Sequence, residues 1–336
     1  MTVVGPFGVS VRDPALEADV QASLSAVEAG LAEATKSDVP FITETAQHLA
    51  RAGGKRFRPL LLLLAAQFGD PHAPGVVPSA VVVELTHLAT LYHDDIMDEA
   101  EMRRGVPSAN ARWNNSVAVL TGDFLFSRAS TIVADLGPAA VRIQAEAFER
   151  LVTGQILETA GPREGEDPIA HHLDVIAGKT GSLIAVSGRM GSLMSGAPEA
   201  VVHVLAQYGE RIGIAFQLAD DVLDITSDGG ESGKTPGTDL REGVATLPVL
   251  RLREMAARGG SPDDLALCEL LDGDLTDDGR HAEALAALRS HPALARARQD
   301  ALSFAEQARH TLKPLPDCAA KAALAELCDA VADRTS

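Results

Sequence analysis

The chain has few cysteines, and their spacing matches neither a metal site nor a disulfide framework. The three thiols, Cys268, Cys318 and Cys328, are odd in number and include no CxxC pair. We therefore expect no zinc site and no disulfide bonds, and interpret the cysteines as reduced.

Long apolar runs are also missing. The longest one covers residues 60–66, which is far too short to cross a bilayer. The first residues, MTVVGPFGVSVRDP, have no basic start followed by an apolar stretch, as a secretory signal would. We expect no transmembrane segment and a cytoplasmic location.

Basic residues are outnumbered by acidic ones. The 29 Lys and Arg residues against 47 Asp and Glu residues give a formal net charge of -18. A nucleic-acid partner is not expected, because such binding depends on a broad basic surface. A polyanionic substrate would need divalent cations held by carboxylates, together with a few well-placed Arg and Lys side chains.

Aromatic residues and strand patterns are scarce, and the remaining pattern is helical. The chain has two Tyr, one Trp and nine Phe residues, and its segments rich in Ala, Leu and Glu favour helix. Leu16, Val20, Leu24, Val27 and Leu31 follow the spacing of one helix face. Pro and Gly residues divide the chain into roughly ten helices, and no break is long enough for a domain linker. We predict an all-α fold: one domain over residues 1–336, a large helical bundle around a central cavity, with residues 227–243 as a mobile loop.

Two acidic motifs of the form DDxxD end long apolar helical stretches. Asp94 and Asp98 belong to the first motif, and Asp220 and Asp224 to the second. Residues four apart share a helix face with Cβ atoms about 5–6 Å apart, so their carboxylates repel unless cations neutralise them. A single motif of this kind is explained equally well as a solvated helix end. Two motifs favour binding of Mg²⁺, which prefers oxygen ligands and substrate phosphates. We predict that the two helix ends face each other across a cavity and together hold a magnesium-bound diphosphate.

Basic residues lie near both motifs in the sequence. A glycine-opened turn, GGKRFRP, occupies residues 53–59, and its backbone N–H groups and cations suit a phosphate. Arg103 and Arg104 follow the first motif, and guanidinium groups bind phosphate in a bidentate manner. Lys179 interrupts a helical segment, and Lys234 lies in the loop after the second motif. Each lysine alone is equally well explained as an exposed side chain.

Between about residues 53 and 248 the chain resembles the trans-isoprenyl (polyprenyl) diphosphate synthases. The motifs that carry the resemblance occur in the family's order and approximate spacing: GGKRFRP, HLATLYHDDIMDEAEMRRG, GKTGSL, FQLADDVLD and GKTPGTDLREG. The resemblance implies an isoprenoid synthase type I fold, a homodimer, and isopentenyl diphosphate and an allylic diphosphate as substrates. Val244 is a departure, because many members have Lys there, and this leaves one diphosphate contact in doubt.

The resemblance also implies roles for individual residues. Asp94 and Asp98 correspond to ligands of a pair of Mg²⁺ ions and Asp220 to a ligand of a further one, about three in all. Asp95, Asp221 and Asp224 correspond to close or water-mediated support of these ions. The residues implied at the allylic diphosphate are Arg103, Lys179, Thr180, Gln217 and Lys234. Those implied at isopentenyl diphosphate are Lys55, Arg58, His87 and Arg104, with Arg334 near the same substrate.

The expected chemistry is ionisation of the allylic diphosphate followed by attack of the isopentenyl double bond. Metal ions with Arg103, Lys179 and Lys234 would stabilise the departing pyrophosphate, and a closed apolar pocket would protect the carbocation from water. The helix before the first motif is predicted to line the tunnel for the growing chain. The tunnel positions are Ala89, Thr90, Thr86, Val82 and Val83.

Small side chains at Ala89 and Thr90 predict a long product, because nothing bulky at these positions stops the chain. Each helical turn adds about 5.4 Å of depth, which suits a product of about 30 carbons or more, such as a quinone side-chain precursor. We expect such a product to pass to a membrane. Alternatively, Phe126 or Phe148 from another helix closes the tunnel early.

Three other functions remain open. A geranylgeranyl diphosphate synthase would share all the motifs. A class I terpene cyclase also uses DDxxD, but usually with an Asn/Ser/Glu triad, which this sequence lacks, and without the basic isopentenyl site. A regulatory subunit of a heteromeric synthase would tend to lose the acidic motifs, which are both intact here.

Overall fold

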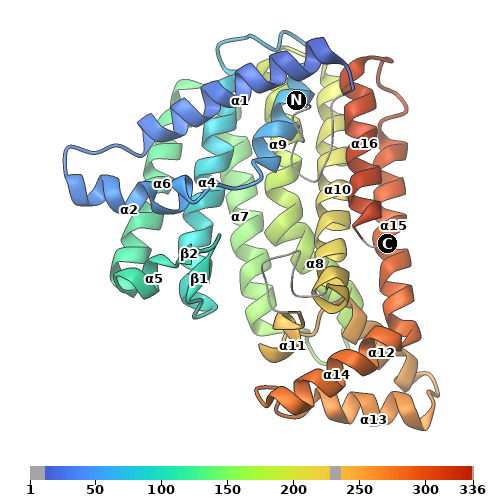
Figure 1. Cartoon of the computed structure of the whole chain (residues 1–336). Helices are drawn as coiled ribbons and strands as arrows, with labels where there is room; N and C mark the ends of the chain where they lie inside the picture. Colours follow the sequence, from blue (N-terminus) through green and yellow to red (C-terminus); the bar gives the residue numbers. More distant parts are fainter. Residues whose placement is uncertain (1–11, 228–235, 335–336) are drawn as a thin grey trace. The chain divides into compact units, whose positions relative to one another are not determined.

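The computed structural model describes residues 12–227 and 236–334, and these residues are almost entirely helical (Figure 1). The only strands among them are β1 (Met102–Arg103) and β2 (Val106–Pro107), which pair in an antiparallel hairpin. The α-helices are α1 (Pro14–Ala34), α2 (Pro40–Arg51), α3 (Phe57–Ala66), α4 (Val76–Met97), α5 (Ala109–Arg112), α6 (Asn115–Asp135), α7 (Pro138–Ala160), α8 (Pro168–Ile176), α9 (Ser182–Met194), α10 (Glu199–Thr226), α11 (Thr238–Arg241), α12 (Leu247–Ala257), α13 (Pro262–Leu271), α14 (Asp278–Ser290), α15 (Pro292–Thr311) and α16 (Ala319–Asp333). A π-helical segment, η2 (Ala177–Gly181), separates α8 from α9. The prediction of an all-α fold is confirmed.

Proline fixes where many helices begin. Helices α1, α2, α7, α8, α13 and α15 each have Pro as their first residue, where its missing N–H costs no hydrogen bond. The expected number of helices was too low. Sixteen α-helices lie within the described ranges. The sequence predicted fewer because apolar spacing does not reveal short helices such as α5 and α11.

The chain divides into two compact units, each containing segments distant in sequence. The first comprises Met1–Glu149, Ser182–Gly209 and Thr311–Leu327, and the second comprises Arg150–Gly181, Glu210–His310 and Cys328–Ser336. The first acidic motif therefore belongs to the first unit and the second motif to the second.

Helix α4 forms the centre of the first unit. It is apolar over nearly its whole length, and it packs against α1, α3, α6 and α9. Helices α3 and α9 approach closely at Gly191, where a Cβ atom would lie 2.1 Å from the carbonyl oxygen of Leu62. Because α4 is enclosed in this way, the acidic residues at its end have a well-defined position within the unit.

The second unit is built around the later part of α10. Its apolar face, which includes Leu218, Val222 and Ile225, belongs to one buried cluster with residues of α12, α14 and α15. Leu247 and Leu288 are fully buried members of that cluster. The second acidic motif lies on this same stretch of α10, so the core of the unit holds the motif in place.

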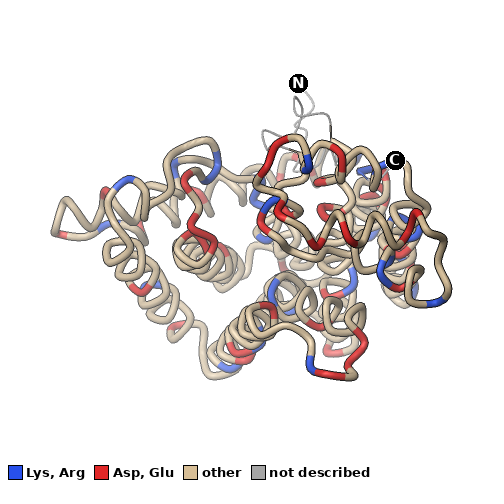
Figure 2. The backbone as a smooth tube through the Cα atoms, turned by 90° about the horizontal axis from the view of Figure 1, so that it is seen from below, with Lys and Arg blue, Asp and Glu red and all other residues tan. Residues whose placement is uncertain are grey.

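Helix α6 is long and apolar enough to cross a membrane by length and composition alone. Its 21 residues include a window with mean hydropathy 1.4, of which 33% is buried. It packs against α4, and its buried residues include Ala118 and Leu125. Charged residues are interspersed along the chain in both units, with no continuous basic stretch among the described residues (Figure 2).

Arg56 joins three segments of the first unit. It has a left-handed backbone (φ 47°) just before α3, and its guanidinium pairs with Glu28 at 2.5 Å and Glu84 at 2.8 Å. Glu84 is 2% exposed, so its charge depends on a partner inside the protein. The sequence placed Arg56 among the cations of the predicted phosphate-binding turn, but in the structure it pairs with carboxylates of α1 and α4.

Replacing Arg56 with Met should destabilise the protein by about 3 kcal/mol, because it leaves the Glu84 carboxylate buried without its nearest cation. Urea unfolding followed by circular dichroism measures this. Lys36→Met is the matched control, since it breaks an ion pair with Glu33 in which both side chains are more than half exposed. The control should leave the urea midpoint nearly unchanged. Equal effects of the two substitutions would contradict a structural role for Arg56.

Candidate active site

The first acidic motif closes helix α4, and its three aspartates have different surroundings. Asp95 is fully buried, and its Oδ1 accepts a hydrogen bond of 2.5 Å from Nε of Arg103. Burial raises the pKa of Asp95, and the Arg103 charge opposes that rise. Asp94 is half-buried, and Asp98, the C-cap residue, is exposed. Asp95 thus anchors the motif, while Asp98 is accessible to a ligand.

The hairpin after the motif carries two arginines, one of which contacts the motif and the other the turn before α3. Arg103 lies on β1, and its Nη2 is also 3.9 Å from Oδ2 of Asp98. Arg104 has a left-handed backbone (φ 54°), and its Nη1 donates to the carbonyl oxygens of Leu49 and Gly53. The hairpin therefore connects the acidic motif with the turn that precedes α3.

That turn carries the predicted phosphate-binding cations. Gly53 and Gly54 have φ values of 90° and 152°, which glycine adopts more readily than other residues. Lys55 is exposed, whereas Nε of Arg58 is buried and has no hydrogen-bond partner among the described residues. Burial lowers the pKa of Arg58 to about 10, with Arg104 adding to the effect and Glu84 opposing it. Arg58 is therefore still charged at neutral pH, and a buried donor of this kind suits an anion.

His87 lies two turns before Asp94 on α4 and close to these cations. Burial lowers its pKa well below the usual value of 6.5, and the positive charges of Arg58 and Arg104 lower it further. The ring is thus neutral at pH 7. Two cations, Arg58 and Arg104, and the neutral His87 beside them form a group in the first unit that we call the cationic cluster. The resemblance implied these residues at isopentenyl diphosphate.

The predicted tunnel positions on α4 are all buried in the first unit: Ala89, Thr90, Thr86, Val82 and Val83. Thr86 donates to the carbonyl of Val82 and lies 3.4 Å from Nε2 of Gln144 on α7, so a polar residue that the sequence did not suggest faces this part of α4. Phe126 and Phe148 stack on each other with ring centroids 4.2 Å apart.

The second acidic motif combines one buried aspartate with two half-buried ones, Asp220 and Asp224. Asp221 is 2% exposed, and its Oδ2 lies 2.9 Å from Nε2 of His172. Asp220 is half-buried and pairs at 2.8 Å with Arg334, whose guanidinium also lies over the ring of Phe216. Arg334, which the resemblance placed near the substrate, is thus next to this motif.

The GKTG segment lies beside the same helix. It forms η2, so the predicted interruption of a helical segment takes the form of a π-helical turn. Lys179 pairs with Glu158 of α7 at 2.6 Å, and Thr180 donates to Oε1 of Gln217 at 3.1 Å. Nε2 of Gln217 is 3.5 Å from Asp221. Three predicted residues of the allylic diphosphate site are therefore neighbours in the second unit, while Lys234 lies outside the described residues.

The η2 segment reaches this position because two glycines allow a close approach. A Cβ atom on Gly154 would lie 2.6 Å from the backbone nitrogen of Lys179, and one on Gly178 would lie 2.9 Å from the carbonyl of Arg150. Any larger side chain at either glycine would push α7 and η2 apart.

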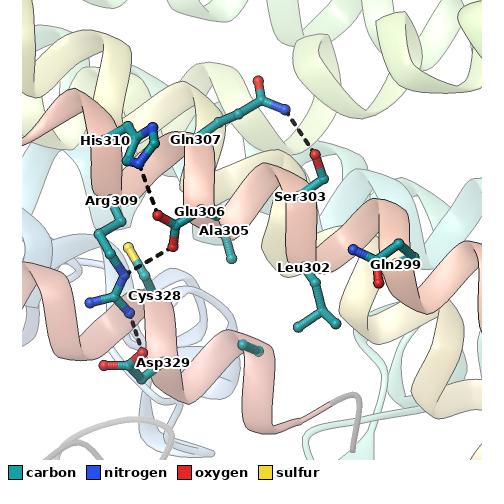
Figure 3. Close-up of a pocket in the computed structure, with 11 residues that line it drawn as sticks. Gln299, Leu302, Ser303, Ala305, Glu306, Gln307, Arg309, His310, Cys328 and Asp329 are labelled. Carbon is teal, nitrogen blue, oxygen red and sulfur yellow. Dashed lines mark hydrogen bonds and ion pairs between the residues drawn. The ribbon is translucent and has the colours of Figure 1, made fainter.

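A pocket of about 560 Å³ lies elsewhere in the second unit, between α15 and α16 (Figure 3). Its charged residues pair with one another, since Arg309 binds Glu306 and Asp329, and His310 binds Glu306. None of the predicted site residues lines it. This pocket is therefore separate from the predicted site residues.

Comparison with known proteins decides the family. The sequence profile of polyprenyl synthetases matches residues 39–288. The chain belongs to the polyprenyl synthetase family. It is 48% identical over 328 residues to a nonaprenyl diphosphate synthase of Mycobacterium tuberculosis, covering 97% of each chain. These findings confirm the family and the class of prenyltransferase that the motifs indicated.

Solved structures agree with this assignment. A geranylgeranyl pyrophosphate synthase from Corynebacterium glutamicum, complexed with calcium and isoprenyl diphosphate, superposes with a TM-score of 0.86 at 43% identity, covering 96% of this chain and 98% of the other. A decaprenyl diphosphate synthase from Rhodobacter capsulatus gives a TM-score of 0.85 at 36% identity, with coverages of 96% and 99%.

The residues of this polyprenyl synthetase fit a divalent cation that is shared with a diphosphate. Within residues 12–227 and 236–334, no three His, Cys, Asp or Glu side chains are arranged to hold a metal by themselves. Mg²⁺ typically uses one or two carboxylates and completes its shell with water and substrate phosphates, so a preformed protein cage is not needed. Oδ2 of Asp95 is buried and has no hydrogen-bond partner in the described part of the chain, which suits a nearby cation or water.

Sequence reasoning missed the groups that orient the predicted residues. Glu158 pairs with Lys179 from 21 positions away, and His172 contacts Asp221 from 49 positions away. Gln144 and the core role of Arg56 were not foreseen either. Such contacts come from tertiary packing and leave no local pattern in the sequence. The adjacent His171 and His172 on an amphipathic helix were the one signal that could have pointed to the partner of Asp221.

His87 should make the protein less stable as the pH falls. Its pKa is depressed in the folded state, so below pH 6.5 the unfolded chain binds a proton that the folded chain does not. Between pH 6.5 and 5.5 this contributes a loss of about 1 kcal/mol, which His87→Gln should remove. Urea unfolding of both proteins at the two pH values measures the difference. Equal pH dependence in the two proteins would contradict a buried neutral histidine.

Proposed function

We propose that this chain is a Mg²⁺-dependent enzyme that condenses an allylic diphosphate with isopentenyl diphosphate, head-to-tail and in trans geometry. The products are a long-chain polyprenyl diphosphate and pyrophosphate. The observation that carries the proposal is the pairing, within the first unit, of an acidic motif with the cationic cluster of Arg58, Arg104 and His87. An enzyme that uses two diphosphates needs both, one for the metal-bound substrate and one for direct anion binding.

The acidic motifs are proposed to hold about three Mg²⁺ ions, with Asp94, Asp98 and Asp220 as ligands. Asp95, Asp221 and Asp224 support these residues. When bound, Mg²⁺ supplies Lewis-acid stabilisation of the pyrophosphate leaving group. The calcium in the structure from Corynebacterium glutamicum is consistent with a divalent ion in this family. That both motifs bind one shared diphosphate remains our prediction.

The cations of the chain are proposed to bind the two diphosphates. Arg103, Lys179, Thr180, Gln217 and Lys234 hold the allylic diphosphate and offset the charge that develops on it. Lys55, Arg58, His87 and Arg104 hold isopentenyl diphosphate so that its double bond lies next to the allylic carbon, which lowers the entropic cost of their reaction. No protein nucleophile takes part. Apolar side chains around the reacting carbons exclude water from the carbocation.

A product of about 30 carbons or more is proposed from the small residues on α4, since Ala89 and Thr90 leave room for the chain to descend by helical turns. The relatives include a nonaprenyl, a decaprenyl and a geranylgeranyl synthase, so similarity alone does not decide the length. Geranylgeranyl diphosphate synthase remains the alternative. Membership of the polyprenyl synthetase family disfavours a terpene cyclase, and intact acidic motifs disfavour a regulatory subunit.

We further propose that the chain acts as a single catalytic domain, as a homodimer and in the cytoplasm, with its product passed to a membrane. The family match spans segments of both units, which supports one domain. On α6, Val119 and Leu120 are 41% and 66% exposed, and an apolar partner surface would cover them. A second copy of this chain is the partner that the proposal names.

The purified chain should convert farnesyl diphosphate and labelled isopentenyl diphosphate, in the presence of Mg²⁺, into products of about 30 carbons or more, as the α4 geometry predicts. Chromatography of the dephosphorylated products measures their length. A series that ends at the geranylgeranyl product would contradict the long-chain proposal. No turnover with any allylic primer would favour the regulatory-subunit function.

Ala89→Phe should shorten the product, because an aromatic ring would block the chain one helical turn below the motif. Leu265→Phe is the matched control: it places the same ring at an exposed position of α13, outside the predicted tunnel. The control should leave the product distribution unchanged, and circular dichroism should show that both variants are folded. An unchanged distribution in a folded Ala89→Phe variant would mean that the tunnel lies elsewhere.

A further inference from the structure

Two helices that follow the second acidic motif lack a side-chain cap of their own. The N-cap residue of α11 is Gly237, which has no side chain, and that of α12 is Thr246, whose side chain makes no cap hydrogen bond. The Thr246 hydroxyl is in fact buried without a hydrogen-bond partner in the described residues. The first N–H groups of a helix need acceptors, so another residue must supply them.

Asp224 supplies the acceptor for α11. Its Oδ1 accepts from the backbone N–H of Thr238 at 3.1 Å and its Oδ2 from that of Asp239 at 3.2 Å, while its carbonyl oxygen accepts from Gly237 at 2.7 Å. Thr238 and Asp239 are the first two residues of α11. Both carboxylate oxygens of Asp224 are therefore used in beginning this helix.

Asp221 supplies an acceptor for the first N–H group of α12 in the same way. Its Oδ2 lies 3.4 Å from the backbone nitrogen of Leu247, the first residue of α12, and accepts this N–H. The same oxygen is 2.9 Å from Nε2 of His172, and Oδ1 is 3.5 Å from Nε2 of Gln217. Asp221 is buried, so these hydrogen bonds replace its contacts with water.

His172 is the group that connects Asp221 to α8. The neighbouring His171 has a different partner, the carbonyl oxygen of Leu157 at 3.2 Å, and does not contact α10 through a hydrogen bond that the structure records. Of this pair, His172 is therefore the one that orients the acidic motif.

We propose that the aspartates of the second acidic motif have different roles. Asp220 binds metal, whereas Asp221 and Asp224 are positioning residues that cap α12 and α11, and His172 orients Asp221. This inference rests on the proposed function for the role of Asp220, but the capping contacts stand independently of it. A carboxylate at a helix N-terminus is stabilised by the N–H groups and by the helix dipole. Binding a metal through Asp221 or Asp224 would require giving up those hydrogen bonds.

Asparagine and alanine substitutions separate capping from metal binding, because asparagine still caps a helix but has no charge to offer a cation. The readouts are Mn²⁺ binding by the full chain in the presence of inorganic pyrophosphate, followed by electron paramagnetic resonance, and the thermal midpoint. Asp220→Asn should lose Mn²⁺ binding, while Asp221→Asn and Asp224→Asn should bind it nearly as well as the wild type. Asp221→Ala and Asp224→Ala should lower the midpoint by roughly 2–4 °C, and the asparagine variants, which keep one acceptor oxygen of the two, should lower it less.

The proposal is overturned if Asp221→Asn or Asp224→Asn weakens Mn²⁺ binding as much as Asp220→Asn does. It is also overturned if the alanine variants melt at the wild-type midpoint. Failure of the wild type to bind Mn²⁺ with pyrophosphate would instead contradict the proposed function, and the thermal midpoints would still test the caps. The two failures are therefore distinguishable.

His172 is tested against its neighbour. Because His172 acts through Asp221, which is not proposed to bind metal, His172→Leu should lower the thermal midpoint and leave Mn²⁺ binding nearly unchanged. His172→Gln should restore much of the midpoint by providing an N–H donor. In an Asp221→Ala background, His172→Leu should cause little further loss, whereas the loss caused by His171→Leu should be additive, because its partner is the carbonyl oxygen of Leu157. Equal additivity of the two leucine variants would reduce His172 to a structural residue and overturn its assignment.

Discussion

A charged side chain that is removed from water must have an opposite charge or a hydrogen-bond partner, and this requirement organises both units of the protein. In the first unit, buried Glu84 is matched by Arg56, and buried Asp95 by Arg103. In the second unit, buried Asp221 is matched by His172. These pairs fix the helices on which the remaining motif residues are presented.

The same requirement explains why the aspartates of one motif are not equivalent. Sequence spacing alone treats the residues of DDxxD as one set of ligands. In the structure the middle aspartates, Asp95 and Asp221, are the buried ones and pair inside their own unit, whereas Asp98 is exposed. Each motif thus contains a buried residue that fastens it to its own unit, beside aspartates that are half-buried or exposed. The cations of the turn before α3 show the same division, with Arg56 used in the core and Arg58 keeping a buried donor without a protein partner among the described residues.

Much of the fold could be predicted because its signals are local. The apolar spacing in residues 16–31 correctly predicted the buried face of α1, and prolines marked the start of six helices. The break at Lys179 was predicted from GKTG, although its π-helical form was not. Short helices were missed, since four residues carry no measurable periodicity. The partners of the site residues were missed for a different reason: Glu158 and His172 reach Lys179 and Asp221 only after α7, α8 and α10 have packed.

The central claim is that the two acidic motifs act together on one metal-bound diphosphate. The most direct measurement is a crystal structure of the full chain with Mg²⁺ and an unreactive analogue of the allylic diphosphate. The account predicts oxygen atoms of Asp94, Asp98 and Asp220 at about 2.1 Å from Mg²⁺ ions that share the phosphate oxygens of one diphosphate. A diphosphate held by the metals of only one motif, with the other motif lacking any contact to it, would contradict the account.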